Sequence, residues 1–302
     1  MSRKILFLYG GFSAEREVSI ATKTDIETAL KSKGYDVISF NLSDTRELLE
    51  TINKVKPDVV FNGLYGNWGE DGELQSLLDM LQIPYTHSSA KASMLGMDKN
   101  LSKIIAEQNG VKTAKGEKTT YAEYLKNGTE IKYPYVVKPV ADGSSVGVFI
   151  VKNKQDESKV KYDDPQADIL IEKYIAGQEL TVMCLEGKAY LVTELRAQNE
   201  FYDYSAKYTS GVTQHVLPAP LSKEISDTCL HYAEIMHKAI NCNTLSRCDF
   251  RYNPEDGVVF LEINTNPGMT KLSLVPEQAK YIGISYADLC EKLVKNATCR
   301  KI

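Results

Sequence analysis

Polar side chains with metal-binding chemistry follow an apolar run near the C-terminus. The run "VVFL" (residues 258–261) leads into Glu262 and Asn264, and a Pro-Gly turn comes soon after. Because successive side chains of a strand point to opposite faces, Glu262 and Asn264 face the same side. By the same rule, Arg247 and Asp249 share one face of the run "SRCDFRY". If the two strands pair, Asp249, Glu262 and Asn264 form an oxygen-rich cluster of the kind that Mg²⁺ prefers.

The alternative interpretation of these residues is a solvated sheet face with charges pointing outward. That alternative fits poorly with a core-like run directly before Glu262, because strands buried on both faces read as continuous apolar segments. We therefore favour a metal site.

A second candidate site is the segment "YVVKPVADGSSVGV", in which Lys138 ends an apolar run and a small, flexible loop follows. Backbone N–H groups and the hydroxyls of Ser144 and Ser145 can wrap a triphosphate, while the lysine supplies a positive charge. An ordinary hairpin with a solvated lysine explains the same residues equally well. The loop also matches the hydrolase pattern G-x-S-x-G, but that pattern needs a helix after the serine. An apolar, strand-like run follows instead, which disfavours a serine hydrolase.

Composition excludes several classes of protein. The 302 residues carry a net charge of −4, which does not favour binding to nucleic acid or to an anionic membrane. The longest apolar runs are too short to span a bilayer, and the N-terminal run is too short for a signal peptide. The six cysteines form no C-x-x-C pair, so we expect free thiols and a cytoplasmic protein. The four histidines are scattered, which argues against a histidine metal site.

The elements expected to position these residues fall into three segments. Strand and helix patterns alternate over residues 1–92, which predicts a parallel-sheet α/β domain that includes a short last strand, "PYTHS". A single helix over residues 90–110 then leads into a central lobe (93–176). Further strands and helices form a larger α+β domain (177–302). Ligands of such parallel sheets bind beyond the carboxyl ends of the strands, where Gly10-Gly11 and the turn 63–72 lie.

The motifs resemble those of the D-alanine–D-alanine ligase family, which belongs to the ATP-grasp superfamily, and the resemblance runs nearly end to end. It rests on the identity, order and spacing of eight segments: "GGFSAEREVS", "GEDGELQ", "MDKNLSK", "VVKPVADGSSVGV", "EKYIAGQELTV", "YDYSAKYTSG", "SRCDFR" and "LEINTNPGMTKLSLVP". The fold that it implies is an N-terminal α/β domain followed by a two-lobed ATP-grasp fold.

The resemblance assigns ATP and Mg²⁺ (or Mn²⁺), as two ions, to named positions. Lys99, Lys138 and the loop with Ser144 and Ser145 would contact the phosphates. Glu172, Lys173 and Ile175 would meet adenine, and Glu179 the ribose hydroxyls. Asp249, Glu262 and Asn264 would hold the metal, in agreement with the strand argument.

The resemblance also implies the reaction. The carboxylate of a first D-alanine attacks the γ-phosphate of ATP, and the amine of a second D-alanine attacks the resulting acyl phosphate. Arg247 and the N–H of Gly268 would form the oxyanion hole. Glu15 would bind the ammonium group of the first D-alanine, and Ser144 would hydrogen-bond toward Glu15 and Tyr208. Ser273 and Lys207 would receive the second carboxylate.

Two further expectations follow from the resemblance. The segment Tyr202–Gly211 would act as a lid that excludes water, and its Lys207-Tyr208 pair accompanies dipeptide formation. Tyr65 occupies a place where many family members carry a histidine. Tyrosine can hydrogen-bond but cannot carry positive charge, so we expect a first substrate site with altered affinity and pH dependence.

The resemblance further implies a homodimer, with two D-alanines and ATP as ligands. The nearest alternative is a related ligase that uses D-lactate or D-serine as the acceptor. A non-catalytic nucleotide-binding module is a second alternative, which the complete set of charged residues disfavours.

Overall fold

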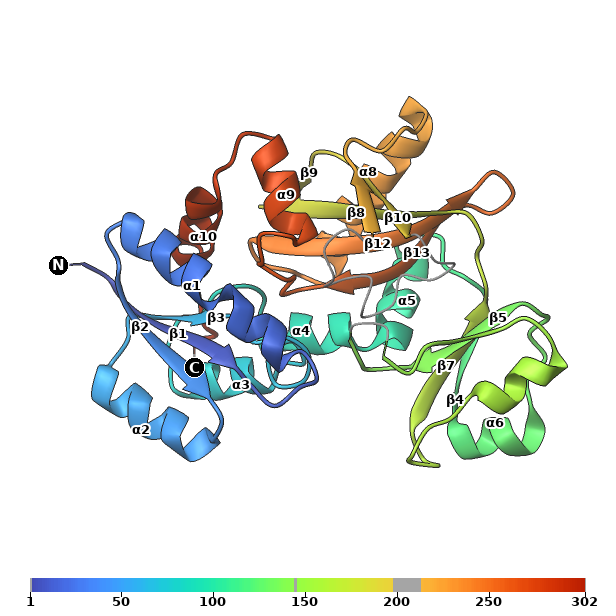
Figure 1. Ribbon diagram of the computed structural model, residues 1–302, viewed down its shortest axis with the longest axis horizontal. Coiled ribbons are helices and arrows are strands. Elements are labelled where there is room, and N and C mark those ends of the chain that lie inside the picture. Colours follow the sequence, from blue (N-terminus) through green and yellow to red (C-terminus); the bar gives the residue numbers. More distant parts are fainter. Residues whose placement is uncertain (1, 144–145, 198–212, 302) are drawn as a thin grey trace.

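The computed structural model describes residues 2–143, 146–197 and 213–301, and these residues form three β-sheets (Figure 1). The first sheet is parallel, with strand order β2-β1-β3, as the alternating pattern predicts. Its strands are β1 (Lys4–Gly10), β2 (Asp36–Leu42) and β3 (Val59–Asn62). The associated helices are α1 (Arg16–Ser32), α2 (Thr45–Val55) and α3 (Glu73–Met80).

The prediction of a strand at "PYTHS" is wrong. Only Tyr85 makes ladder contacts there, as an isolated bridge to Val60 on one side and to Thr298 on the other. His87, two residues later, has a φ of 68°. That left-handed conformation is incompatible with an extended strand and ends the pairing after one bridge.

The single helix expected over residues 90–110 is also wrong, because the chain forms two helices, α4 (Ala90–Met97) and α5 (Lys99–Gln108). Asp98 between them is extended, with φ −77° and ψ 102°, and its side chain accepts the N–H of Leu101 at 2.8 Å. The N–H of Lys99 donates to the carbonyl of Val140 at 2.9 Å. The break places Lys99 at the start of a helix, directly beside the segment that leads into the proposed phosphate loop.

The central lobe has an antiparallel sheet in the order β4-β7-β5-β6. Its strands are β4 (Gly116–Thr120), β5 (Tyr135–Pro139), β6 (Phe149–Val151) and β7 (Asp168–Lys173). Helix α6 (Tyr121–Asn127) and a 3₁₀ turn (Lys154–Lys159) accompany it. Tyr121, Tyr124 and Tyr135 share the apolar core of this lobe with Val137 and Ile171. The sequence patterns did not predict β4 or α6.

The third sheet runs β11-β10-β8-β12-β13, with β9 beside β8. Its strands are β8 (Gln178–Leu185), β9 (Lys188–Ala189), β10 (Thr193–Ala197), β11 (Thr213–Val216), β12 (Leu245–Asn253) and β13 (Gly257–Asn264). The helices of this part are α8 (Lys223–Ala239), α9 (Leu274–Tyr281) and α10 (Tyr286–Lys295). None of the helices in the described part of the chain is long and apolar enough to cross a membrane.

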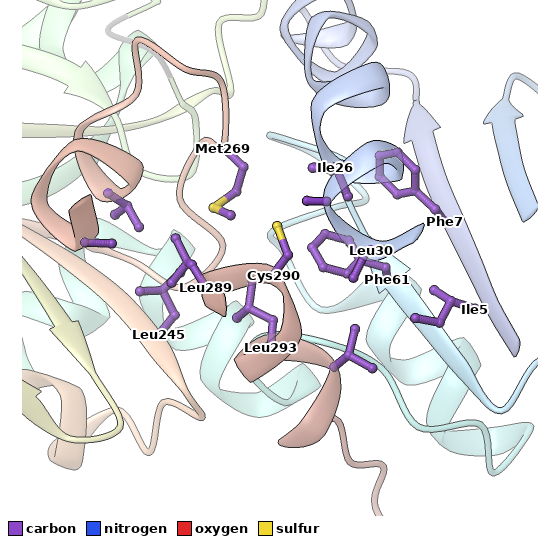
Figure 2. Packing of buried hydrophobic residues seen from close by; sticks show 14 of the residues in the cluster. Ile5, Phe7, Ile26, Leu30, Phe61, Leu245, Met269, Leu289, Cys290 and Leu293 are labelled. Carbon is purple, nitrogen blue, oxygen red and sulfur yellow. The ribbon is translucent and has the colours of Figure 1, made fainter. Parts of the chain in front are cut away.

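The first and last segments share one hydrophobic core, so they pack as a unit (Figure 2). Ile5 and Phe7 of β1 and Leu30 of α1 lie in the same cluster as Leu289 and Leu293 of α10. The C-terminal residues then return to the first segment through the bridge between Thr298 and Tyr85. Each sheet lies within one of the expected segments, and the boundaries 1–92, 93–176 and 177–302 stay a prediction.

Candidate active site

One pocket collects the predicted site residues. It is bounded by strands β5 and β7 of the central lobe, by β12 and β13 of the third sheet, and by turns of the first segment. Its lining contains every predicted site residue that the structure describes: Glu15, Tyr65, Lys99, Lys138, Glu172, Lys173, Ile175, Glu179, Arg247, Asp249, Glu262, Asn264, Gly268 and Ser273. Ser144, Ser145, Lys207 and Tyr208 lie outside the described residues. The individual roles of these residues remain predictions.

Strands β12 and β13 pair as expected, and a β-bulge decides where their polar side chains point. Asp249 lies opposite Glu262, but Phe250 lies opposite Phe260, so Leu261 is an extra residue in β13. Strict alternation would place Glu262 on the same face as Phe260, which is buried in an apolar core with Phe250. The bulge turns Glu262 to the pocket instead, a common use of bulges beside active sites.

The oxygen ligands at this edge suit Mg²⁺ in chemical type. Asp249 and Glu262 supply carboxylates and Asn264 a carboxamide, all in the pocket wall. Within the described ranges no group of three or more His, Cys, Asp or Glu residues is placed to hold a metal. A set of two carboxylates nonetheless fits a Mg²⁺ ion that takes its other ligands from phosphate oxygens and water.

Asp249 is already engaged by protein groups. Arg247 donates from Nη2 to Oδ2 at 2.8 Å and from Nε to Oδ1 at 3.0 Å, and the Thr181 hydroxyl donates to Oδ1 at 2.6 Å. Asn264 Oδ1 accepts the N–H of Asn266 at 2.9 Å. These contacts fix the orientation of both side chains before any ligand binds.

Lys99 connects the metal edge to the proposed phosphate loop. Its Nζ lies 3.5 Å from Oε2 of Glu262 and donates to the carbonyl of Asp142, the residue before Gly143 in that loop. The side chain is 11% exposed and lines the pocket. Its ammonium is therefore held between a carboxylate and a loop carbonyl, at a point where a phosphate could bind.

A buried carboxylate, Glu172 of β7, lies between two lysines. Its Oε1 is 2.5 Å from Nζ of Lys138 on β5, and its Oε2 is 2.7 Å from Nζ of Lys103 on α5. Burial alone would raise the pKa of Glu172, but the two ammonium groups outweigh it and lower that pKa to about 2. Burial lowers the pKa of Lys103, and Glu172 opposes that shift.

The side chains expected around adenine and ribose come from the end of β7, the start of β8 and the segment between these strands. Glu179 pairs across the sheet with Arg251, and their side chains approach at 3.4 Å. The Arg251 guanidinium also lies 5.7 Å from the centre of the Tyr174 ring. Ile175 packs in a small apolar cluster with Ala114 and Val259. This end of the pocket thus combines apolar surface with a few oriented charges, which suits a nucleoside.

Carboxyl groups gather at the end nearest the first segment. Glu15 follows the Gly10-Gly11 turn, and a Cβ added at Gly143 would lie only 2.9 Å from its Oε2. Glycine at 143 therefore allows the backbone there to approach Glu15 closely. Glu70 is buried in the same lining, and burial, with the Glu15 charge second, raises its pKa well above the usual value, against the opposing charge of Arg247.

Tyr65 contacts the backbone on the far side of the pocket. Its phenolic oxygen accepts the N–H of Met269 at 3.0 Å, and its own carbonyl accepts the Ser13 hydroxyl at 2.6 Å. Tyr286 of α10 donates to the carbonyl of Met269 at 2.7 Å. Two phenols therefore hold Met269, the residue after the expected oxyanion donor Gly268, one through its N–H and one through its carbonyl. Burial raises the pKa of Tyr65 above its ordinary value, so the phenol stays neutral.

Ser273 lies beside Gly268. Its hydroxyl accepts the N–H of Thr270 at 3.0 Å, and a Cβ added at Gly268 would lie 3.1 Å from its Oγ. Helix α9 begins at the next residue, Leu274.

Sequence reasoning missed three residues that the pocket and its support include. Glu70 lies within "GEDGELQ" and Lys103 within "MDKNLSK", and both segments were used for the resemblance without a role for these side chains. Arg251 follows Arg247 and Asp249 at the same period of two, so the strand argument could have included it.

Family models match both parts of the chain. The model described as D-ala D-ala ligase C-terminus matches residues 105–295, and the one described as D-ala D-ala ligase N-terminus matches residues 42–88. The chain belongs to the D-alanine–D-alanine ligase family. The expected fold class is confirmed, since solved structures of the family with the ATP-grasp fold align with nearly the whole chain.

Relatives of this family match over almost their whole length. The D-alanine–D-alanine ligase of Ruegeria sp. (strain TM1040) is 42% identical, covering 99% of this chain and 97% of the relative. That of Acidiphilium cryptum (strain JF-5) is 41% identical, covering 99% of both. A structure of the Bacillus anthracis ligase complexed with ATP has a TM-score of 0.82 and 30% identity, covering 98% of this chain and 97% of the other. The VanG D-Ala:D-Ser ligase from Enterococcus faecalis has a TM-score of 0.82 and 25% identity, covering 98% and 99%.

Proposed function

We propose that this chain joins two D-alanine molecules into D-alanyl-D-alanine, converts ATP to ADP and phosphate, and so supplies a peptidoglycan precursor. The observation that carries the proposal is the single pocket in which the predicted site residues of a D-alanine–D-alanine ligase family member meet. The named relatives at about 40% identity over the whole chain support the same activity.

In the first step the carboxylate of one D-alanine attacks the γ-phosphate, which gives an acyl phosphate and ADP. Glu15 accepts hydrogen bonds from the ammonium group of that D-alanine, and the nearby carboxyl of Glu70 adds polar surface. Lys99 and Lys138 neutralise phosphate charge, and such positioning and neutralisation are the main protein contribution to phosphoryl transfer.

Asp249, Glu262 and Asn264 would hold Mg²⁺ with the nucleotide, as two ions in our proposal. The metal, when bound, would neutralise charge on the phosphates. Arg247 keeps Asp249 oriented for this role through two hydrogen bonds from its guanidinium.

In the second step the amine of the second D-alanine attacks the acyl carbonyl, and phosphate leaves. Arg247 and the N–H of Gly268 stabilise the oxyanion that develops on the carbonyl. Tyr65 supports this geometry indirectly, because it holds the adjacent Met269 peptide. Ser273, at the start of α9, donates to the carboxylate of the acceptor, and the partial positive charge of a helix N-terminus favours an anion there.

A different acceptor is the second candidate function. The fold does not discriminate between acceptors, because a D-Ala:D-Ser ligase matches it with a TM-score of 0.82. The Lys207-Tyr208 pair of the sequence favours D-alanine, and these residues lie outside the described ranges. We further propose that the enzyme acts in the cytoplasm as a homodimer. The six free cysteines support the reducing compartment.

Coupled measurement of ADP formation tests the proposal. Purified protein with ATP and Mg²⁺ should form ADP only when D-alanine is added, and mass spectrometry should detect D-alanyl-D-alanine. Parallel reactions with D-alanine plus D-serine or D-lactate should give mainly the D-alanine dipeptide. Absence of D-alanine-dependent ADP formation would refute the activity, and a dominant mixed product would refute the acceptor assignment.

A further inference from the structure

Lys103 contacts the ligand site only through another residue. The described residues that line the pocket include Glu172 and Lys138 but not Lys103. All three side chains are buried, with exposed fractions of 7% for Lys103, 4% for Glu172 and 9% for Lys138. Lys103 therefore lies behind the pocket wall, and its ammonium is 2.7 Å from the carboxylate of Glu172.

Lys138 has two competing partners in the proposed reaction. In the structure its ammonium lies 2.5 Å from Oε1 of Glu172, and in the proposed mechanism it neutralises phosphate. When Lys138 turns toward a phosphate, Glu172 loses one of its two counter-charges. A buried carboxylate without a counter-charge is strongly unfavourable, because the interior cannot solvate it. If Lys138 were the only cation beside Glu172, its movement to a phosphate would leave the buried carboxylate without any counter-charge.

Lys103 is placed to remove that conflict. It emerges from α5, one turn beyond Lys99, and its Nζ also lies 3.4 Å from the carbonyl of Phe260 in β13. These contacts come from the protein interior, so a ligand in the pocket does not compete for them. The Lys103 ammonium therefore stays beside Oε2 of Glu172 whether Lys138 faces Glu172 or the nucleotide.

We infer that Lys103 is a positioning residue for ATP: it is the permanent counter-charge of Glu172, which frees Lys138 for the phosphates and holds Glu172 against the adenine ring. The inference rests on the proposed function. It also bears on base selectivity. The adenine 6-amino group can donate to a fixed carboxylate, whereas the guanine 6-oxo group is an acceptor and repels it.

The test compares Lys103→Met with Lys31→Met by steady-state kinetics on the full-length protein. Lys31 also pairs with a glutamate, Glu27, but on the exposed surface of α1. Lys103→Met should raise the KM for ATP at least about tenfold, because an unpaired buried charge costs more than that factor. It should also lower the ratio of kcat/KM for ATP to kcat/KM for GTP. The KM for D-alanine should change less than about twofold, as should all constants of Lys31→Met, since distant sites act independently.

A double-mutant cycle with Glu172→Gln separates this role from simple structural support. Without the carboxylate there is no charge for Lys103 to balance. In the Glu172→Gln background, Lys103→Met should therefore change the KM for ATP by less than about twofold. Lys103→Arg, which keeps the charge, should preserve more of the ATP affinity than Lys103→Met. An unchanged KM for ATP in Lys103→Met overturns the inference, and so does an equal loss in both backgrounds.

Two controls keep the result interpretable. If Lys103→Met does not fold, the comparison is made between Glu172→Gln and the double variant. Removal of Lys103 from the Glu172→Gln variant should stabilise the fold and leave the ATP affinity of that variant unchanged. Weaker ATP binding there overturns the inference. Direct calorimetric titration with ATP and Mg²⁺ measures nucleotide affinity without D-alanine. A wild-type protein that binds ATP but forms no dipeptide would refute the proposed activity while the calorimetric comparison still tests Lys103.

Discussion

Two Lys–Glu–Lys arrangements in the described chain have the same chemistry and different surroundings. On the surface of α1, Glu27 lies between Lys23 and Lys31, each one helical turn away. In the wall of the pocket, Glu172 lies between Lys103 and Lys138, which come from a helix and a strand far apart in sequence. The Lys23–Glu27 and Lys103–Glu172 distances are both 2.7 Å. Side-chain exposure is 54% for Lys31 but only 7% for Lys103.

The comparison separates the effect of a partner from the effect of burial. Hydrogen bonds from Lys23 and then Lys31 lower the pKa of Glu27 to about 2, the same value that Glu172 reaches against the opposing effect of burial. Water can replace either lysine of the surface group, so each surface pair stabilises the fold by only about 0–1 kcal/mol. Water cannot replace the buried partners. Removing one partner from the buried group should therefore destabilise the fold more than removing one partner from the surface group.

The largest expected effect is on stability, in Glu172→Gln. The change leaves two buried lysines without their shared carboxylate, so the free energy of unfolding should fall by about 3–5 kcal/mol. Denaturant unfolding of the full chain measures it, with Glu27→Gln as the matched surface change. Equal losses in the two variants would mean that burial makes no difference here.

The next largest effect is on activity, in Glu262→Gln, which changes a carboxylate that is open to the pocket. Its side chain is 31% exposed and 3.5 Å from Lys99, so stability should change by less than about 1 kcal/mol. Turnover should fall at least about 100-fold, because a proposed metal ligand is lost. ADP formation at several Mg²⁺ concentrations measures this loss, with the exposed Glu255→Gln as control. Full activity in Glu262→Gln would rule out the metal assignment.

A smaller effect is expected for Tyr65→Phe, which removes a buried hydrogen bond without changing a charge. The N–H of Met269 loses its acceptor, which should cost about 1–3 kcal/mol of stability. The kcat should fall about tenfold, because Gly268, the proposed oxyanion donor, loses the support of its neighbour Met269 while other donors remain. Tyr124→Phe removes a buried hydroxyl contact to Tyr135 in the central lobe and is the matched control. Equal kcat values in both variants would contradict a role of Tyr65 at the site.

The smallest effect is expected for Glu27→Gln, measured as a function of pH. The folded-state pKa of Glu27 is lowered, so its contribution to stability is present above its usual pKa of 4.5 and is lost as the pH falls toward about 2. Wild type should therefore exceed the variant by about 1 kcal/mol or less at pH 7 and match it near pH 2. Thermal unfolding across this range measures the difference. A difference that grew on acidification would contradict the assignment.

The sequence predicted most of the elements that carry the site. Strands β12 and β13 contain the two runs named from the sequence and pair as expected, because both runs are strongly patterned. It failed at residues 90–110, where apolar residues continue across the break and only the Asp98 cap divides the helix. It also failed at residues 84–88, since a single bridge depends on partners that are distant in sequence.

The sequence by itself determined which chemistry is available: carboxylates and an amide at the end of one strand, lysines beside a glycine-rich loop, and the order of motifs that identifies the family. Tertiary structure decided which side each group faces. The bulge at Leu261 turned Glu262 away from the core, and the approach of α5 to β7 gave Glu172 a second lysine. Strand periodicity is a local property, whereas a register shift and an ion pair between distant elements depend on how the sheets pack.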